Sequence, residues 1–163
     1  MSFHIRWATA ADAPAAYRLI AELAEYEKAP QAVTVSCEQF VADGFGAKPR
    51  YRLLLAEHLP DSSPRTPEIV GIALFYDAYS TWKGKTIYLD DLVVTEAYRR
   101  YGIGKQLIDE VLRVARAENA NQVRWHVLDW NEPAIRFYQK MGLKMEANWI
   151  TCKYEKNLLY AQL

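Results

Sequence analysis

A chain of 163 residues that is 51% hydrophobic and 25% charged can bury one core but is short for two. Its 20 Lys and Arg residues balance 20 Asp and Glu residues, which argues against nucleic-acid or anionic-membrane partners. No apolar run is long enough to span a bilayer, and the start "MSFHIRWATA" lacks the character of a signal peptide. We therefore expect one cytoplasmic domain over residues 1–163, with Cys37 and Cys152 as reduced thiols.

The first third of the chain predicts one strand and two helices. Residues 3–8 alternate like a strand, and Thr9 to Asp12 resembles a capping box that opens a helix. One more turn of that helix's apolar stripe places Glu27 on the buried side. Ser36 then caps a second, shorter helix, which ends near two glycines.

The remaining pattern completes a mixed α/β fold. Residues 51–57, 68–76 and 86–94 indicate three consecutive strands, which should pair antiparallel. They are followed by a helix over 104–118, a strand over 122–128, a helix over 131–142 that Gly142 stops, and a final strand over 148–158. This order predicts a mixed, largely antiparallel central sheet flanked by helices.

The junction of the third of these strands with the next helix has the composition of an anion site. The strand ends at Val94, and Arg99, Arg100, Gly102 and Gly104 follow where the helix begins. A helix N-terminus presents unpaired N–H groups, and glycine allows a ligand to approach the backbone closely. The stretch lacks the Lys-Ser/Thr of a Walker loop and the third glycine of a dinucleotide fingerprint. A glycine turn beside two solvated arginines is the alternative interpretation.

A second motif makes the pattern specific. "VVTEAYRRYGIG" followed by "DWNEPAIRFYQKMGL" resembles the Gcn5-related N-acetyltransferase (GNAT) superfamily. The cofactor-loop pattern of that superfamily is matched by Arg99, Gly102 and Gly104. Its later helix pattern is matched by Asn131, Ala134, Phe137, Tyr138 and Gly142. From about Ile5 to Lys156 the chain is similar to the spermidine/spermine N-acetyltransferase branch, which includes thialysine acetyltransferases.

The resemblance implies acetyl-CoA as co-substrate, no metal, and a cleft where two parallel strands splay apart. It implies that the pyrophosphate is held by the loop Arg99, Arg100, Tyr101, Gly102, Ile103, Gly104 and Lys105. The strand residues Leu92, Val93 and Val94 would offer backbone groups to the pantetheine arm. From the other side of the cleft, the contacts would come from Asn131, Pro133 and Ala134. As an alternative, Asn131 is a helix N-cap.

Acetyl transfer to an amine requires a base, and the resemblance assigns Asp90, with Asp91 beside it. Successive strand residues face opposite sides, so both carboxylates reach the cleft only if a bulge intervenes. An exposed Asp is a weak base, so burial or a neighbour such as Glu27 would have to raise its pKa. A strand-end capping or salt-bridging pair is the alternative interpretation.

The departing CoA thiolate requires an acid, and Tyr138 occupies that position in the motif. The resemblance implies direct attack in a ternary complex, without a covalent enzyme intermediate. On periodicity alone, Tyr138 is a core aromatic, because Ala134, Phe137 and Met141 lie on the same helical stripe. His126 is interpreted as an ordinary strand side chain.

Tyr26 and Glu27 match substrate-side positions of the branch, and Asp90 and Asp91 add carboxylates for a cationic chain. Trp82 would flank that chain with its ring face. Glu22 and Glu25 are either further carboxylates of this groove or a solvated helix end.

The polyamine enzymes of the branch carry Glu where this chain has Asp90. A thialysine-like, lysine-like or other small primary amine is therefore an alternative to polyamines and diamines. A non-catalytic acyl-CoA-binding module is a second alternative. The resemblance also implies a homodimer.

Overall fold

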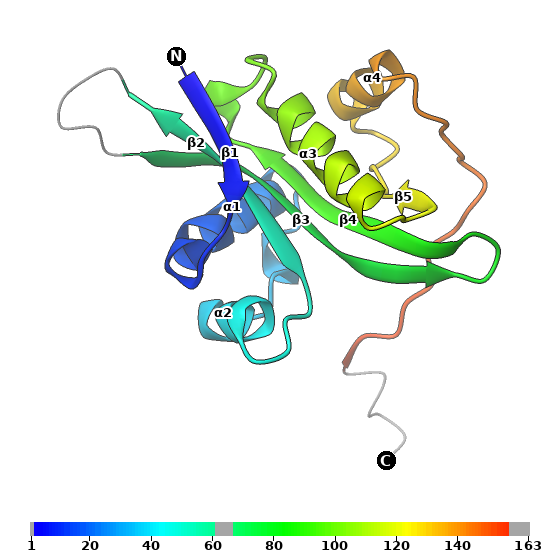
Figure 1. The fold of residues 1–163 in the computed structure, drawn as a ribbon, viewed down its shortest axis with the longest axis horizontal. Helices are drawn as coiled ribbons and strands as arrows, with labels where there is room; N and C mark the ends of the chain where they lie inside the picture. The colour runs from blue at the N-terminus through cyan, green and yellow to red at the C-terminus, as the bar shows by residue number, and fades with distance from the viewer. Residues whose placement is uncertain (1, 61–66, 157–163) are drawn as a thin grey trace. The chain divides into compact units, whose positions relative to one another are not determined.

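The computed structural model describes residues 2–60 and 67–156. The chain divides into two compact units, Met1–His126 and Val127–Leu163. Figure 1 shows the first unit as a twisted sheet with helices packed on it. Its strands are β1 (Ser2–Trp7), β2 (Arg52–Leu59), β3 (Glu68–Ser80), β4 (Gly84–Val94) and β5 (Gln122–Arg124). The α-helices among the described residues are α1 (Ala13–Tyr26), α2 (Cys37–Phe45), α3 (Ile103–Ala117) and, in the second unit, α4 (Glu132–Lys140). Whether residues 1–163 fold as a single domain stays a prediction.

The sheet has the predicted mixed topology. Its order is β1-β2-β3-β4-β5, with antiparallel pairs throughout except the parallel pair of β4 and β5. The parallel register starts at Thr86↔Gln122 and ends at Tyr88↔Arg124, whereas β4 continues to Val94. The parallel strands are therefore paired only at the start of β4, as expected for strands that splay.

Helices cover both faces of this sheet. Leu53 and Leu55 of β2 share one core cluster with Ile72 and Leu74 of β3, and α1 and α2 pack against it. Because side chains alternate across a strand, the residues between them face α3. At Gly71, for example, an added Cβ would lie only 3.3 Å from Ile103 Cγ2, so this glycine allows close packing of α3.

The predicted helix signals are confirmed. The backbone N–H and Oγ1 of Thr9 both donate to Asp12 Oδ2, at 2.7 and 2.8 Å, and a 3₁₀ turn (η1, Ala10–Asp12) leads into α1. Ser36 Oγ accepts from the N–H of Gln39 and caps α2. Gly142 has φ of +72° just after α4, a conformation that suits glycine at a helix end. None of the helices within the described ranges is long and apolar enough to cross a membrane.

One predicted strand is shorter than expected, and a second does not form within the described residues of its range. The strand over 122–128 ends at Arg124, and residues 148–155 of the predicted final strand adopt no strand; residues 157–158 lie outside the described residues. A strand requires a partner for its backbone N–H and C=O groups, and alternation alone does not supply one. In the second unit, Trp149, Ile150 and Tyr154 are exposed, so the apolar residues of this segment do not form a buried strand face in this chain.

Candidate active site

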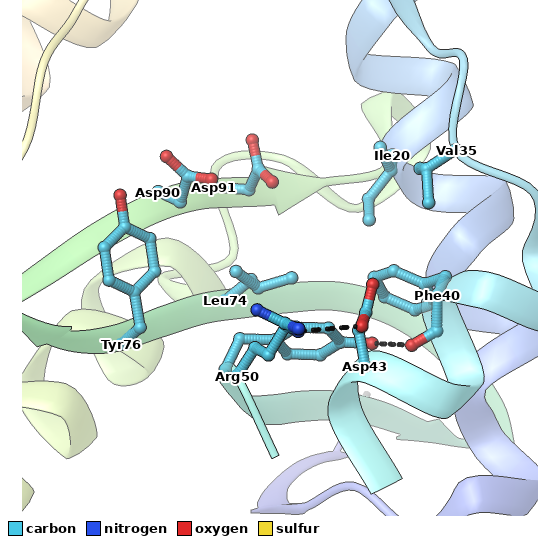
Figure 2. Close-up of a pocket in the computed structure, with 10 residues that line it drawn as sticks. Ile20, Val35, Phe40, Asp43, Arg50, Leu74, Tyr76, Asp90 and Asp91 are labelled. Carbon is cyan, nitrogen blue, oxygen red and sulfur yellow. Dashed lines mark hydrogen bonds and ion pairs between the residues drawn. The ribbon is translucent and has the colours of Figure 1, made fainter. Parts of the chain in front are cut away.

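A bulge places both aspartates of β4 on one face of the sheet. In the β3–β4 register, Leu74 lies opposite Asp91 and Phe75 lies opposite Leu89, so Asp90 is an extra residue without a partner. A bulge of this kind turns the side chains of two successive residues to the same side. Figure 2 shows Asp90 and Asp91 pointing the same way from β4, which fulfils the condition stated from the sequence.

The two carboxylates line a pocket of about 410 Å³ on the face of the sheet covered by α1 and α2. Aromatic and aliphatic side chains from α1, α2, β3 and the segments just before α2 and β2 form most of its wall, and an ion pair lies at one side (Figure 2). The lining residues are Ile20, Val35, Phe40, Asp43, Arg50, Tyr51, Leu74, Tyr76, Asp90 and Asp91. Pockets of this size typically accept small molecules.

The electrostatics of this pocket favour a proton acceptor that works near neutral pH. Burial, together with the charges of Asp90 and Glu27, raises the pKa of Asp91 to about 7. Desolvation by the surrounding protein also raises the pKa values of Asp90 and Glu27. Glu27, just after the end of α1, is half-buried, as predicted. A carboxyl group with a pKa near 7 combines a large ionised fraction with useful basicity.

A structural ion pair does not explain these carboxylates. Within residues 2–60 and 67–156, no Lys, Arg or His forms a salt bridge with Asp90 or Asp91. Like charges that lie close together without a cation are unfavourable for folding, and such arrangements concentrate at functional sites. The pair is therefore a candidate for proton transfer.

The start of α3 has the backbone geometry of an anion site. Gly102 is the N-cap, with φ of +81°, and an added Cβ there would meet no atom within 4 Å. The first turn of α3 contains no acidic residue, and no side chain caps it. The first N–H groups of a helix lack intrahelical acceptors, so those of Ile103, Gly104 and Lys105 are available by geometry. A phosphate-bearing ligand fits this open, uncapped helix start.

The basic side chains of this loop are directed differently from one another. Arg99 Nε donates to the carbonyl of Val94 at 2.9 Å, and its guanidinium carbon lies 4.9 Å from the centre of the Tyr26 ring. Lys105 Nζ pairs with Asp109 at 2.5 Å. Arg100, with φ of +69°, is exposed. Arg99 therefore braces the loop against β4 and α1, and Arg100 is left as the exposed cation beside the helix start.

A second contact joins α1 to this loop. Glu22 Oε2 accepts from Thr95 Oγ1 at 3.1 Å, and Oε1 accepts from the backbone N–H of Glu96 at 3.3 Å. Neither sequence-based interpretation of Glu22, a polyamine contact or a solvated side chain, describes this role. Through Glu22 and Tyr26, helix α1, which Glu27 follows directly, is held against the segment that leads to the candidate anion loop.

The edge of β4 beyond Tyr88 has one strand neighbour in the described structure. Leu92, Val93 and Val94 pair with β3, and β5 ends before it reaches them. Their other edge is therefore not engaged by β5, as the predicted pantetheine contact requires. The Val94 carbonyl is already the acceptor for Arg99.

The second unit carries the remaining predicted residues. Asn131 Oδ1 accepts from the N–H of Ala134 at 3.3 Å, so the N-cap interpretation of Asn131 is confirmed, and Pro133 lies in the first turn of α4. Tyr138 is buried, with 8% of its surface exposed, on the stripe that also includes Phe137. The roles of Asn131, Pro133, Ala134 and Tyr138 toward the cofactor stay predictions.

Trp82 lies apart from the carboxylates within this chain. It is 85% exposed in the turn between β3 and β4, and it does not line the pocket. From Gly84 to Asp90 the strand extends about 20 Å, at ~3.3 Å per residue. No sequence motif marks four further pocket residues, and only the packing of α2 against the sheet brings them together: Asp43, Arg50, Tyr51 and Tyr76.

A proton acceptor near neutral pH and a helix start suited to phosphate are features that an enzyme needs in order to transfer a group from an anionic carrier to an amine. Residues 20–143 match the acetyltransferase (GNAT) family, and the chain belongs to that family. It is an N-acetyltransferase, and its fold is the GNAT fold.

Three comparisons describe its relatives. Over 139 residues it is 46% identical to thialysine N-epsilon-acetyltransferase of Bos taurus, covering 85% of this chain and 82% of the bovine protein. It is 34% identical over 160 residues to spermidine/spermine N(1)-acetyltransferase-like protein 1 of Homo sapiens, covering 96% of this chain and 23% of the human protein. An aminoglycoside N-acetyltransferase solved in complex with CoA is similar in fold, with a TM-score of 0.72 at 16% identity over 94% of this chain and 95% of that one.

Proposed function

We propose that this chain transfers the acetyl group of acetyl-CoA to the primary amine of a small polyamine, diamine or amino compound. The observation that carries the proposal is the bulge at Asp90, which turns Asp90 and Asp91 into one pocket where the pKa of Asp91 rises to about 7. The relatives named for thialysine and for spermidine/spermine support an amine acceptor and leave both substrate classes open.

The pair of carboxylates solves the first problem of the reaction. An alkylamine with a pKa near 10.4 is mostly protonated at pH 7, and forming the free amine costs about 4.6 kcal/mol. In the proposed step, Asp91, aided by Asp90, accepts that proton directly or through water. The amine nitrogen then bonds to the acetyl carbon and gives up its second proton, the thioester C–S bond breaks, and CoA leaves as a thiolate that takes a proton from Tyr138, the acid predicted from the sequence. The sequence assigned Asp90 as the base, and that assignment stays a prediction. The raised pKa favours Asp91 as the group that accepts the proton, with Asp90 beside it.

The loop before α3 is proposed to hold the pyrophosphate of acetyl-CoA. The uncapped helix start, the open space at Gly102 and the exposed Arg100 support this proposal. Backbone N–H groups at a helix N-terminus favour a phosphate without the need for a lysine of the Walker type. Holding both reactants in one orientation contributes about 7 kcal/mol or more in favourable cases.

A non-catalytic acyl-CoA-binding module needs the loop but not the carboxylate pair. Two carboxylates without a cationic partner in one pocket disfavour folding, and such a module would have no use for them. The unpaired carboxylates and the membership of an acetyltransferase family therefore favour an enzyme. We further propose, from the resemblance alone, a cytoplasmic homodimer.

An acetyl-CoA-dependent screen tests the proposal. Spermidine, spermine, thialysine, lysine and small diamines would each be offered with acetyl-CoA, and thiol release would be measured. We expect turnover of at least one primary amine. Thiol release from none of them, by a folded protein that binds CoA, would favour the non-catalytic module.

Tyr138→Phe is expected to lower kcat by about 10²-fold with little change in CoA affinity, because it removes a proton donor and keeps the ring. The measurements are steady-state kinetics with the best amine and calorimetry with CoA. Tyr79→Phe, which removes the hydroxyl of an exposed tyrosine on β3, is the matched control. Equal kcat values for Tyr138→Phe and the parent would return Tyr138 to its interpretation as a core aromatic.

A further inference from the structure

The pocket contains a second charged group that the proposed transfer step does not use. Asp43, near the end of α2, and Arg50, just before β2, form an ion pair in which Arg50 Nε lies 3.1 Å from Asp43 Oδ1. Both residues line the same pocket as Asp90 and Asp91. Figure 2 shows the pair separated across the pocket from the two aspartates of β4.

The local backbone fixes the position of this ion pair. The N–H of Arg50 donates to the carbonyl of Asp43 at 2.7 Å, which closes the loop between α2 and β2. Tyr51 OH donates to the carbonyl of Phe40 at 2.6 Å, which ties the start of the following segment to α2. Gly44 makes this possible, because a Cβ there would lie 2.3 Å from Tyr51 Cζ. Asp43 and Arg50 are therefore presented by a braced turn.

The ion pair leaves hydrogen-bonding capacity on both partners. Among residues 2–60 and 67–156, neither Nη1 nor Nη2 of Arg50 donates a hydrogen bond, and the Arg50 side chain is 77% exposed. Asp43 is 29% exposed and uses one carboxylate oxygen in the pair. The nearby Arg52, by contrast, is held by Asp77 and Glu118. Arg50 thus has donors for a ligand carboxylate, and Asp43 has an acceptor for a ligand ammonium group.

We propose that Asp43 and Arg50 bind the zwitterionic head group of an α-amino acid whose side-chain amine is the group acetylated at Asp90 and Asp91. The guanidinium accommodates the α-carboxylate, Asp43 receives the α-ammonium group, and the apolar wall formed by Leu74 and Phe40 covers the aliphatic stem. A guanidinium is unfavourable for a polyamine, which carries only positive charge. The pocket therefore selects a basic amino acid over a diamine of the same length.

This inference rests on the proposed amine acetylation and specifies its substrate class. Its test compares L-lysine with 1,5-diaminopentane, which has the same chain and terminal amine but lacks the carboxylate. In the parent protein, kcat/KM is expected to be higher for lysine. Arg50→Gln is expected to lower the lysine-to-diamine ratio of kcat/KM by about 10- to 100-fold, because a charge-assisted contact is lost. Arg50→Lys, which keeps a point charge, is expected to restore part of the ratio.

Lys48→Gln is the matched control, since it removes a positive charge from the same turn and does not line the pocket. It is expected to keep the parent's ratio. A lysine-to-diamine ratio in Arg50→Gln equal to that of the parent would overturn the inference while leaving amine acetylation intact. A higher kcat/KM of the parent protein for 1,5-diaminopentane than for L-lysine would also overturn the inference.

If neither compound is acetylated, the proposed function fails for this pair of amines, and binding still tests the inference. Calorimetry with L-lysine and the CoA-saturated protein is then expected to show weaker binding to Arg50→Gln than to the parent. Equal binding to the two proteins would overturn the inference independently of turnover.

Discussion

Asp91→Asn is expected to reduce kcat/KM at pH 7 by about 10³-fold for the best amine of the screen, because it removes a general base whose pKa lies near the working pH. The parent's kcat/KM should fall as the pH drops through about 7, since only the ionised carboxylate accepts a proton. In Asp91→Asn, this acidic limb should disappear. Raising the pH should restore part of the rate, because more of the amine is free without assistance.

Asp90→Asn should behave differently. The charge of Asp90 contributes to the raised pKa of Asp91, so its removal lowers that pKa and moves the acidic limb to lower pH. Asp90→Asn should also lose rate if Asp90 is itself the base, as the resemblance of the sequence implies. The pH–rate profiles of the two variants therefore distinguish the residue that acts as the base from the neighbour that only raises the pKa of that base.

The test of Asp91 also needs a measurement of folding and a matched control variant. Burial raises the pKa of Asp91 because it disfavours the charged form, so Asp91→Asn should not lower the melting temperature at pH 8. Glu110→Gln removes a carboxylate of α3 that pairs with Arg113, and its profile should match that of the parent. An Asp91→Asn variant with a parent-like rate throughout would exclude Asp91 as the base.

Much of the fold was predictable because it depends on local signals. The caps at Thr9 and Ser36 and the stop at Gly142 involve contacts within a few residues, and all three occur as predicted. The continuous apolar runs of β2 and β3 likewise report burial against helices on both faces of the sheet. The two wrong predictions lack such a buried run: the strand expected over 122–128 ends at Arg124, and residues 148–155 form no strand.

The candidate site was predictable only where a motif covers it. Asp90 and Asp91 were identified by resemblance, but their common orientation depends on the register shift at Leu74, which the sequence does not encode locally. Arg50 follows Pro49 in a turn without a motif, and it enters the pocket only because α2 packs beside β3. The sequence shows which residue types are present. Their chemistry depends on strand register and helix packing, which only the tertiary structure provides.

Gly102→Val is expected to abolish measurable binding of acetyl-CoA, because a branched side chain would occupy the open space beside the first N–H groups of α3. The φ of +81° also makes the substitution strained, by roughly 1–3 kcal/mol, so the fold must be checked separately. Gly102→Ala adds only a Cβ and should weaken binding less. Gly142→Ala is the matched control, since Gly142 has φ of +72° and equally open surroundings outside the loop. Calorimetry with CoA and thermal melts decide the outcome: a folded Gly102→Val variant that binds CoA like the parent would show that the pyrophosphate lies elsewhere.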